Sequence, residues 1–364
     1  MQFEIERTEF IRALESANKA TAGKETPILG NIYVRAEAEK IQIAGYDLAT
    51  AIFTEVPARV AEAGEACFPA DTVSKFLSKC DDAWTNISTD EKLTVKCGRS
   101  KVSAAVAPAE DYPLPERLSA EAQEFYIDNN LLTALLKKTM FAASQDSVRP
   151  ELKCVNLAVS GGKITVTAGD GYRVAVCTQE AEYISKLGKA SFNLFRENLQ
   201  TALAVLRTPR ITVRYDKRNI EFSDDVGTSV IMSVCANEYP DFPSRIKKYE
   251  NSVKQRITLK SEDLYETLQR IAALPKSLTV PVVFNFGIDT ATITYGSGFA
   301  DLVDKLDCKT EGDPFAIGLN LKFLTEAVKN AEGDVTFCCN GSAGPIIFES
   351  SGAKNMIMPM RLKR

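Results

Sequence analysis

A strand, a glycine-rich turn and a second strand recur three times along this chain. The clearest copy is Ile164–Val176, where β-branched residues alternate as in a half-buried strand and Gly169 to Gly171 supply the turn. Similar segments lie at Ile41–Leu48 and at Ala291–Asp301. This repetition predicts three similar structural units that are rich in strand hairpins.

The same order of elements surrounds each copy: a strand, a helix, several strands, a second helix and further strands. Helical apolar stripes are predicted at residues 8–20, 70–80, 130–143, 196–207, 264–274 and 321–328. Asp71 is the expected N-cap of the second of these helices. A linker at Pro108–Glu121 and a proline-marked loop at Tyr239–Ser244 interrupt the pattern.

These interruptions predict three domains, residues 1–120, 121–248 and 249–364. Each would place two helices against sheets that continue into the next domain, because one helix cannot cover a multistranded sheet. The expected fold class is therefore α+β with antiparallel sheets. Repeated units of this kind either stay open or close with a partner copy into a ring that leaves no exposed sheet edge.

Composition indicates an ordinary soluble globular protein, with 45% hydrophobic and 25% charged residues among 364. No apolar run reaches membrane-spanning length, and the first residues resemble no export signal. We therefore expect a cytoplasmic location with no membrane partner. The nine cysteines are then expected to be reduced thiols.

The residues that usually carry catalysis are scarce. The chain has no histidine, no Cys-x-x-Cys pair and no phosphate-binding Gly-x-x-x-x-Gly-Lys-Ser/Thr motif, so we expect no catalytic residue, no metal site and no cofactor. Two acidic pairs, Asp81-Asp82 and Asp224-Asp225, leave a metal-dependent hydrolase as an alternative. Both pairs lie in predicted turns, where adjacent side chains diverge.

Four motifs in order give the chain a resemblance to a known family. They are Pro27–Asn31, Gly169–Cys177, Tyr239–Phe242 and Met358–Leu362. Together with the threefold repeat, they make the chain similar over its whole length to the β subunit of bacterial DNA polymerase III, the DNA sliding clamp. The resemblance implies three clamp-type domains forming a half-ring, which dimerises head to tail into a ring around duplex DNA.

A ring would hold DNA topologically, which reconciles DNA binding with a net charge of −4. By resemblance, the DNA-facing candidates are Arg12, Lys24, Lys75, Arg149 and Arg196. Asp71 stands where the family often has a basic residue. The dimer contact would join Val102 and Ala104 to Ala273 and Leu274 of a second copy.

The resemblance also implies an apolar pocket that binds linear peptide motifs of the replicative polymerase and other DNA-handling proteins, with a separate clamp loader opening the ring. Its expected residues are Leu152, Gly169, Gly171, Tyr172, Arg173, Val174, Pro240, Ile246, Asn320, Phe323, Met358, Pro359, Met360 and Arg361. Methionine side chains adapt to different ligands, which suits a shared site. The alternative to a processivity clamp is a peptide-binding scaffold that has lost its hold on DNA.

Overall fold

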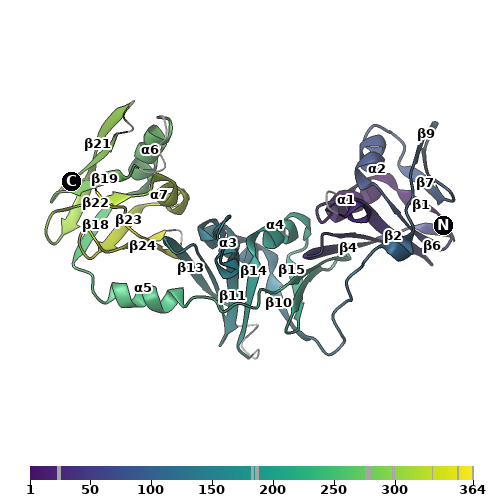
Figure 1. Cartoon of the computed structure of the whole chain (residues 1–364), viewed down its shortest axis with the longest axis horizontal. Helices are drawn as coiled ribbons and strands as arrows, with labels where there is room; N and C mark the ends of the chain where they lie inside the picture. Colours follow the sequence, from purple (N-terminus) through teal and green to yellow (C-terminus); the bar gives the residue numbers. More distant parts are fainter. Residues whose placement is uncertain are drawn as a thin grey trace. The chain divides into compact units, whose positions relative to one another are not determined.

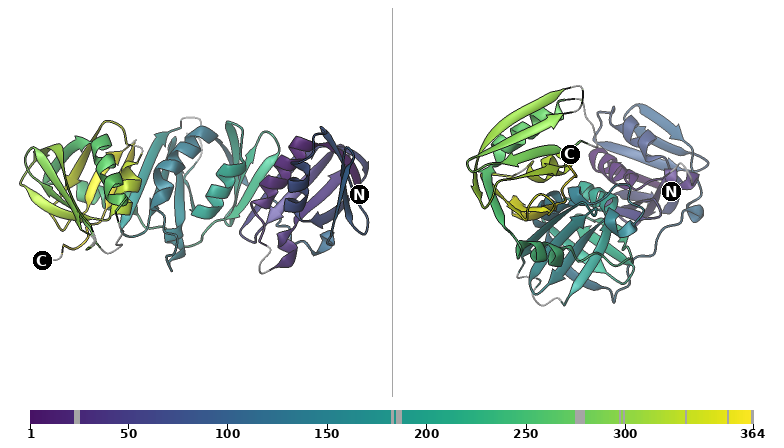
Figure 2. Two further views of the ribbon diagram at one scale, coloured as in Figure 1. Left: turned by 90° about the horizontal axis from the view of Figure 1, so that it is seen from above. Right: turned by 60° about the vertical axis from the view of Figure 1, so that its left-hand side comes forward.

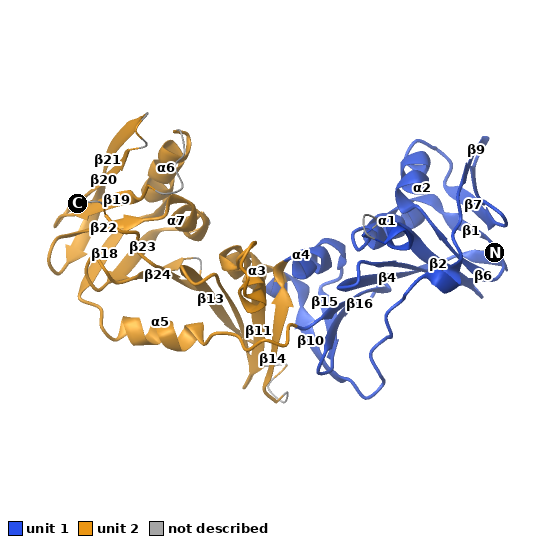
Figure 3. Cartoon of the chain, viewed as in Figure 1, with its two compact units in different colours: residues 1–132, 197–234 blue, residues 133–196, 235–364 orange. Residues whose placement is uncertain are grey.

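The computed structural model describes residues 1–22, 26–181, 184, 188–274, 280–296, 298, 300–329, 331–350 and 352–362. Lys24 therefore lies outside the described residues, as do residues 297 and 299 in the third copy of the repeated turn. The chain forms two compact units (Figure 3). Unit 1 comprises residues 1–132 and 197–234, and unit 2 comprises residues 133–196 and 235–364.

Unit 1 is built on two antiparallel sheets. Its strands are β1 (Gln2–Glu6), β2 (Ile32–Glu37), β3 (Lys40–Tyr46), β4 (Thr50–Pro57), β5 (Arg59–Glu62), β6 (Gly64–Phe68), β7 (Trp84–Thr89), β8 (Leu93–Cys97), β9 (Ser100–Ala104), β10 (Gln123–Asp128), β15 (Arg210–Tyr215), β16 (Asn219–Asp224) and β17 (Thr228–Ser233). The five-stranded sheet has the order β5-β1-β7-β8-β9, and the eight-stranded sheet has the order β10-β15-β16-β17-β4-β3-β2-β6. Its helices are α1 (Arg7–Asn18), α2 (Ala70–Leu77) and α4 (Arg196–Val205), with short 3₁₀ turns at Pro27–Gly30 and Ala109–Asp111.

Helix α1 packs beside α2 and against the eight-stranded sheet (Figures 1 and 2). The Glu6 carboxylate caps its first turn by accepting from the backbone N–H groups of Thr8 and Glu9. A stripe of buried residues, Phe10, Ala13, Leu14 and Ala17, fixes the face that meets the sheet. Gly45 permits this contact, because a Cβ there would lie 1.9 Å from the Ala17 carbonyl oxygen.

Asp71 does not cap α2, so that expectation is wrong. The helix begins one residue earlier, after Pro69, and has no side-chain cap. The Asp71 carboxylate instead pairs with Lys75 at 2.9 Å and accepts a hydrogen bond from the Asn18 amide at 2.9 Å. An acidic residue in the first turn of a helix can pair with a lysine one turn later instead of capping the helix, so its position near the helix start does not by itself predict a cap.

The linker that follows β9 is ordered on the face of the eight-stranded sheet. Tyr112 and Leu118 are buried there. The guanidinium of Arg117 lies 3.6 Å from the centre of the Phe53 ring and donates to Glu221 and Ser229 at 2.9 and 2.6 Å. Because Phe53 is in β4 and the two acceptors are in β16 and β17, Arg117 spans the β4–β17 seam.

Unit 2 has one continuous antiparallel sheet. Its strands are β11 (Cys154–Ser160), β12 (Lys163–Gly169), β13 (Arg173–Glu180), β14 (Ala190–Phe195), β18 (Gln255–Lys260), β19 (Val282–Phe286), β20 (Thr290–Gly296), β21 (Asp301–Glu311), β22 (Phe315–Leu319), β23 (Asp334–Cys339), β24 (Ile346–Ser350) and β25 (Ala353–Ile357). The order is β14-β11-β12-β13-β25-β24-β23-β18-β21-β20-β19-β22. Its helices are α5 (Phe242–Glu250), α6 (Ser261–Ala272) and α7 (Leu321–Val328), with 3₁₀ turns at Met140–Ala142 and Pro150–Lys153. Helix α3 (Asn129–Thr139) runs from unit 1 into unit 2.

The expected α+β class with antiparallel sheets is confirmed, since every named strand pair is antiparallel. The compact units divide the second repeat between them, because β17 of that repeat pairs with β4 and β13 pairs with β25. The division into domains 1–120, 121–248 and 249–364 stays a prediction. In the described part of the chain, no helix combines the length and apolarity needed to cross a membrane.

Helix α5 is absent from the sequence prediction, which expected only a loop at Tyr239–Ser244. The structure starts a helix at Phe242, with the Asp241 carboxylate accepting from the Ser244 N–H at 3.1 Å. Hydrogen bonds from the side chain and the backbone of Ser244 hold the pKa of Asp241 below its usual value. Pro243 lies in the first turn, where the missing N–H of proline costs nothing, so it does not break this helix.

Candidate functional site

The glycine-rich turn between β12 and β13 is the centre of the candidate site in unit 2. The Asp170 carboxylate accepts from the backbone N–H groups of Tyr172 and Arg173, both at 2.9 Å. Gly171 has φ +93°, in the left-handed region that favours glycine. The turn is therefore fixed by one carboxylate and one glycine, and it projects the exposed Tyr172 side chain.

An apolar cluster lies beside this turn. It consists of Leu152, Val174, Phe242, Ile246, Ile347 and Met356, all buried. Gly169 allows the Phe242 ring to approach β12, because a Cβ at this position would lie 2.9 Å from two ring carbons. The cluster joins the turn at Pro150–Lys153, strands β13, β24 and β25, and helix α5.

The segment that leads into α5 is anchored by Tyr239. Its hydroxyl lies 3.3 Å from the Cys154 carbonyl oxygen and 3.2 Å from that of Thr167, two acceptors for one proton. Burial raises the pKa of Tyr239 well above its ordinary value, so the phenol stays protonated and able to donate. The Tyr239 and Phe242 rings meet edge to face with centroids 5.7 Å apart.

A cavity of about 360 Å³ opens next to this cluster. It is lined by Arg149, Leu152, Gly171, Glu238, Tyr239, Pro240, Asp241, Phe242 and Arg245. An apolar floor and a rim of polar and charged groups are typical of a site that takes an apolar side chain and orients its backbone.

Arg173 is only 5% exposed, and its side chain makes several hydrogen bonds and ion pairs within the site. Its Nε lies 3.1 Å from Asp170 Oδ2, one terminal nitrogen donates to the Phe141 carbonyl at 2.7 Å, and the other pairs with Glu326. The guanidinium also lies 4.4 Å from the centre of the Phe323 ring. Arg173 thereby joins the β12–β13 turn to helix α7, and its charge is matched by two carboxylates.

A second cavity, of about 520 Å³, lies on the other side of the turn. Its lining includes Tyr172, Arg173, Arg196, Lys322, Phe323 and Glu326. Helix α7 presents Phe323 here because the Asn320 side chain caps the helix, accepting from the Phe323 N–H at 3.2 Å. This cavity is the more polar of the two in its lining residues.

The last residues of the chain run along the same region. The Met358 N–H donates to the Tyr172 carbonyl at 2.8 Å, and the Met360 N–H donates to the Gly318 carbonyl at 2.8 Å. Met358, Pro359 and Met360 are half-buried, and Arg361 is exposed. Strand β25 ends at Ile357, so the expected final strand through Met360 continues only as the isolated bridge to Gly318.

The structure thus places all fourteen predicted pocket residues in one compact unit. Leu152, Gly169, Val174 and Ile246 belong to or contact the apolar cluster, and Gly171 and Pro240 line the first cavity. Tyr172, Arg173 and Phe323 line the second cavity, Met358 bonds to Tyr172, and Asn320 caps the helix that carries Phe323. Met360 bonds instead to Gly318 of β22. Phe242, Tyr239 and Glu326 were not predicted. An Asp-x-Pro helix start after Tyr239 was the available signal for the first two.

The residues predicted to face DNA or a second copy have other partners, and two of them, Arg149 and Arg196, also line the first and the second cavity, respectively. Arg12 pairs with Glu9, Lys75 with Asp71, and Arg149 with Glu151, while Arg196 donates to the Ala143 carbonyl. Val102 and Ala104 are half-buried on β9, the terminal strand of its sheet, and Ala273 is exposed just after α6, followed by the half-buried Leu274. Roles in binding DNA or a second copy stay predictions for all of these residues.

The acidic pairs lie at or beside strand ends: Asp224 ends β16 and Asp225 follows it in a turn, and Asp81 and Asp82 precede β7. Asp224 is buried and accepts from the backbone N–H groups of Arg207, Val226 and Thr228. Neither pair belongs to a cluster of three potential metal ligands among the described residues.

Replacing Gly169 by alanine is expected to destabilise the site by about 1 to 3 kcal/mol, because the new methyl group would overlap the Phe242 ring. Faster hydrogen exchange in β12, β13 and α5 would measure this loss. Gly188→Ala is the matched control, since a Cβ there meets no atom within 4 Å. Equal exchange in both variants would contradict the close contact.

Comparisons with known proteins agree with this architecture. The chain matches the family models of the DNA polymerase III beta subunit, N-terminal domain, over residues 1–116, and central domain, over residues 126–241. It is 26% identical to a beta sliding clamp of Caulobacter vibrioides and 25% identical to one of Vibrio cholerae, with 100% of each chain covered.

Solved structures show the same fold. DNA polymerase III subunit beta from Pseudomonas aeruginosa superposes with a TM-score of 0.92 at 21% identity, and a DNA polymerase sliding clamp from Bacillus subtilis with 0.92 at 19%, both over 100% of each chain. The two family models together cover more than half of this sequence. The chain therefore belongs to the DNA polymerase III beta subunit family, and as a member it is a non-catalytic sliding clamp of DNA replication.

Proposed function

We propose that two copies of this chain close head to tail into a ring around duplex DNA, and that the pocket in unit 2 tethers the replicative polymerase and other DNA-handling proteins. The observation that carries the pocket's role is the apolar cluster of β13 and α5 beside two open cavities. The partners would insert short linear motifs, and a separate clamp loader would open the ring. We place this activity in the cytoplasm.

The chemistry of the site supports binding of extended peptides with apolar side chains. The buried cluster offers an apolar floor, and the half-buried Met358, bonded to Tyr172, and Met360, bonded to Gly318, add flexible thioethers that suit several ligands. The side-chain oxygen of Asn320 caps α7, so we assign this oxygen a structural role rather than a hydrogen bond to the peptide. Arg361 is exposed and can meet an acidic group on the peptide.

Two free strand edges support closure with a second copy. Strand β9 is the last strand of its sheet. Strand β21 pairs with β18 only from Cys308 onward. The residues of β21 before Cys308 therefore have no strand partner on the β18 side among the described residues. Arg99 and Lys101 lie at the β9 edge, and Asp301 begins β21. Val102, Ala104, Ala273 and Leu274 would supply the apolar part of the contact.

The DNA-facing candidates do not need high affinity, because a closed ring holds its DNA by topology. Each described candidate already has an acceptor within the chain, as Lys75 does in Asp71. Exposed pairs of this kind are worth little and can exchange for phosphate. The same pairing favours the alternative function, a peptide-binding scaffold that does not hold DNA. The following experiment distinguishes the scaffold from the clamp.

The test is retention on nicked circular DNA after loading by a clamp loader, before and after the circle is cut. We expect retention on the closed circle and loss from the cut ends, which requires topological binding. Failure to remain on either form, with peptide binding intact, would support the scaffold. Failure to bind any peptide would refute the pocket proposal independently of the ring.

Replacing Asp71 by asparagine is expected to free Lys75 for phosphate contact. Binding to a short linear duplex should tighten about twofold to fivefold at low salt, with a salt slope steeper by up to about one unit. Fluorescence anisotropy over a salt series would measure both. Asp90→Asn makes the same charge change at an exposed site, and an equal effect there would show that net charge alone is responsible.

A further inference from the structure

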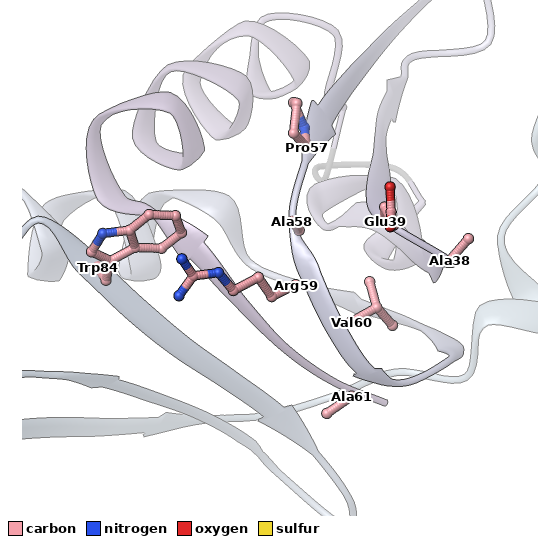
Figure 4. A pocket seen from close by; sticks show the side chains of 8 residues that line it. All are labelled: Ala38, Glu39, Pro57, Ala58, Arg59, Val60, Ala61 and Trp84. Carbon is pink, nitrogen blue, oxygen red and sulfur yellow. The ribbon is translucent and has the colours of Figure 1, made fainter.

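A further concave surface lies in unit 1 and shares no residue with the pocket described above. It has a volume of about 560 Å³ and lies between strand β5, the β2–β3 turn and the start of β7 (Figure 4). We call it the notch, and its walls are Ala38, Glu39, Pro57, Val60, Ala61 and Trp84, with Arg59 reaching across. No role assigned so far uses any of these residues.

Trp84 gives the notch an aromatic wall that is held in place. The indole is 42% exposed, and the Arg59 guanidinium lies 4.4 Å from its ring centre (Figure 4). Arg59 also donates to the Glu4 carboxylate at 2.8 Å. Because Glu4 matches the charge of Arg59, the wall presents flat apolar surface rather than a free anion site.

The floor of the notch is apolar and ends in a free strand edge. Pro57 and Ala61 are exposed, and Val60 is half-buried against the core. Strand β5 is the last strand of its sheet and pairs only with β1, so its outer edge has no strand partner among the described residues. A free edge beside an apolar hollow is the arrangement that takes up an extended peptide as an added strand.

The rim of the notch is acidic. Glu39 is exposed at the β2–β3 turn and has no ion pair among the described residues, while its neighbour Lys40 is matched by Glu55 at 2.7 Å. Glu62, at the end of β5, is also exposed, but its carboxylate pairs with the N-terminal ammonium of Met1 at 3.4 Å. Arg59 and Lys40 are matched by Glu4 and Glu55, so the uncompensated charge at the rim is that of Glu39.

We propose that the notch binds an extended segment of a partner protein that carries apolar side chains between basic residues. The segment would pair with the outer edge of β5 and place one apolar side chain in the notch, over Ala61, with Trp84 as the far wall. Its lysine or arginine residues would flank the apolar side chains, and one of them would face Glu39. This second docking surface is independent of ring closure and of the pocket in unit 2.

Trp84 is the only tryptophan of the chain, so its fluorescence reports on the notch alone. The probe is the synthetic peptide Gly-Ser-Lys-Val-Leu-Val-Lys-Ser-Gly, titrated into the full-length protein. We expect a saturable change in emission at concentrations up to about 1 mM. The peptide with glutamate for both lysines, and the peptide with glycine for the central three residues, should each bind at least about tenfold more weakly.

Two variants test the surface itself. Ala61→Arg should abolish binding by filling the notch with a cation, and Glu39→Lys should weaken it about fivefold or more. Ala63→Arg and Glu91→Lys make the same changes at exposed positions outside the notch and should bind as the parent does. Circular dichroism would confirm that Ala61→Arg is folded, and Glu39→Lys provides a second test that leaves the floor intact.

Three results would overturn the proposal: no emission change with the basic peptide, equal binding of the glutamate peptide, or equal weakening in the control variants. An emission change with protein concentration alone, lost in Ala61→Arg, would instead identify a second copy of the chain as the occupant. That outcome also rejects a basic partner segment.

Discussion

Arg173→Ala is expected to destabilise unit 2 by about 3 kcal/mol and to abolish peptide binding at the pocket. The substitution leaves Asp170 and Glu326 without their shared cation and removes the donor to the Phe141 carbonyl. Removing one partner of a buried ion pair costs more than the pair contributes, because the remaining charge is left without compensation. The partial exposure of Glu326 places the expected value at the lower end of the usual range.

The effect on binding follows from Phe323. Its ring rests on the Arg173 guanidinium, which also fixes the distance between the β12–β13 turn and α7. Without Arg173, the second cavity loses a wall that is set by hydrogen bonds rather than by loose packing. Calorimetric titration with a clamp-binding peptide and hydrogen exchange of β12 and β13 would measure the two consequences separately.

Two variants serve as controls. Arg173→Lys keeps the charge but cannot make three directed contacts at once, so an intermediate loss is expected. Arg256→Ala removes an exposed arginine of the same unit and should change stability by no more than about 0.5 kcal/mol. If Arg173→Ala behaved like Arg256→Ala, the network would not support the pocket.

The strands and first helices were accessible from sequence because their signals are local. Alternation at Ile164–Val176 corresponds to β12 and β13, and the periodic apolar residues near Phe10 correspond to α1. In α1, the small residues Ala13 and Ala17 are buried, and Ala17 is the residue that crosses close to Gly45. A local apolar pattern predicts that a helix or strand forms, but it does not predict which other element that helix or strand packs against.

The site was accessible only in part. Resemblance named residues such as Leu152 and Ile246, which the structure brings into one cluster, but their role in binding stays a prediction. Phe242 was missed because Pro243 suggested a break where it begins a helix. Glu326 was missed because its partner Arg173 lies 153 residues away in sequence, and no local pattern encodes such a contact.

The division into units has a similar cause. Three sequence repeats predicted three domains with sheets that continue from one into the next. Strand pairing joins β4 to β17 and β13 to β25, so backbone hydrogen bonds run across both repeat boundaries. A repeat is visible in sequence, but edge pairing between repeats depends on which strand ends each sheet. The ring that we propose would use two of the free edges, at β9 and at the first residues of β21.

Ala273→Glu is therefore expected to break the proposed ring. Ala273 is exposed at the end of α6, and a carboxylate there would be buried without a partner when a second copy covers it. An uncompensated charge in an interface costs about 2 to 5 kcal/mol, so the dimer dissociation constant should rise by at least about 30-fold. Sedimentation velocity over a concentration series would measure this, and retention on nicked circles should fall in parallel.

The controls separate the interface from the helix end. Ala273→Gln adds similar bulk without charge and should weaken the dimer less, whereas Ala120→Glu adds the charge at an exposed position outside the proposed contact and should leave it unchanged. A monomeric parent protein would refute the ring itself. An unchanged dimer in Ala273→Glu would leave the ring standing but remove Ala273 from its interface, so closure would then depend on pairing of the β9 and β21 edges alone.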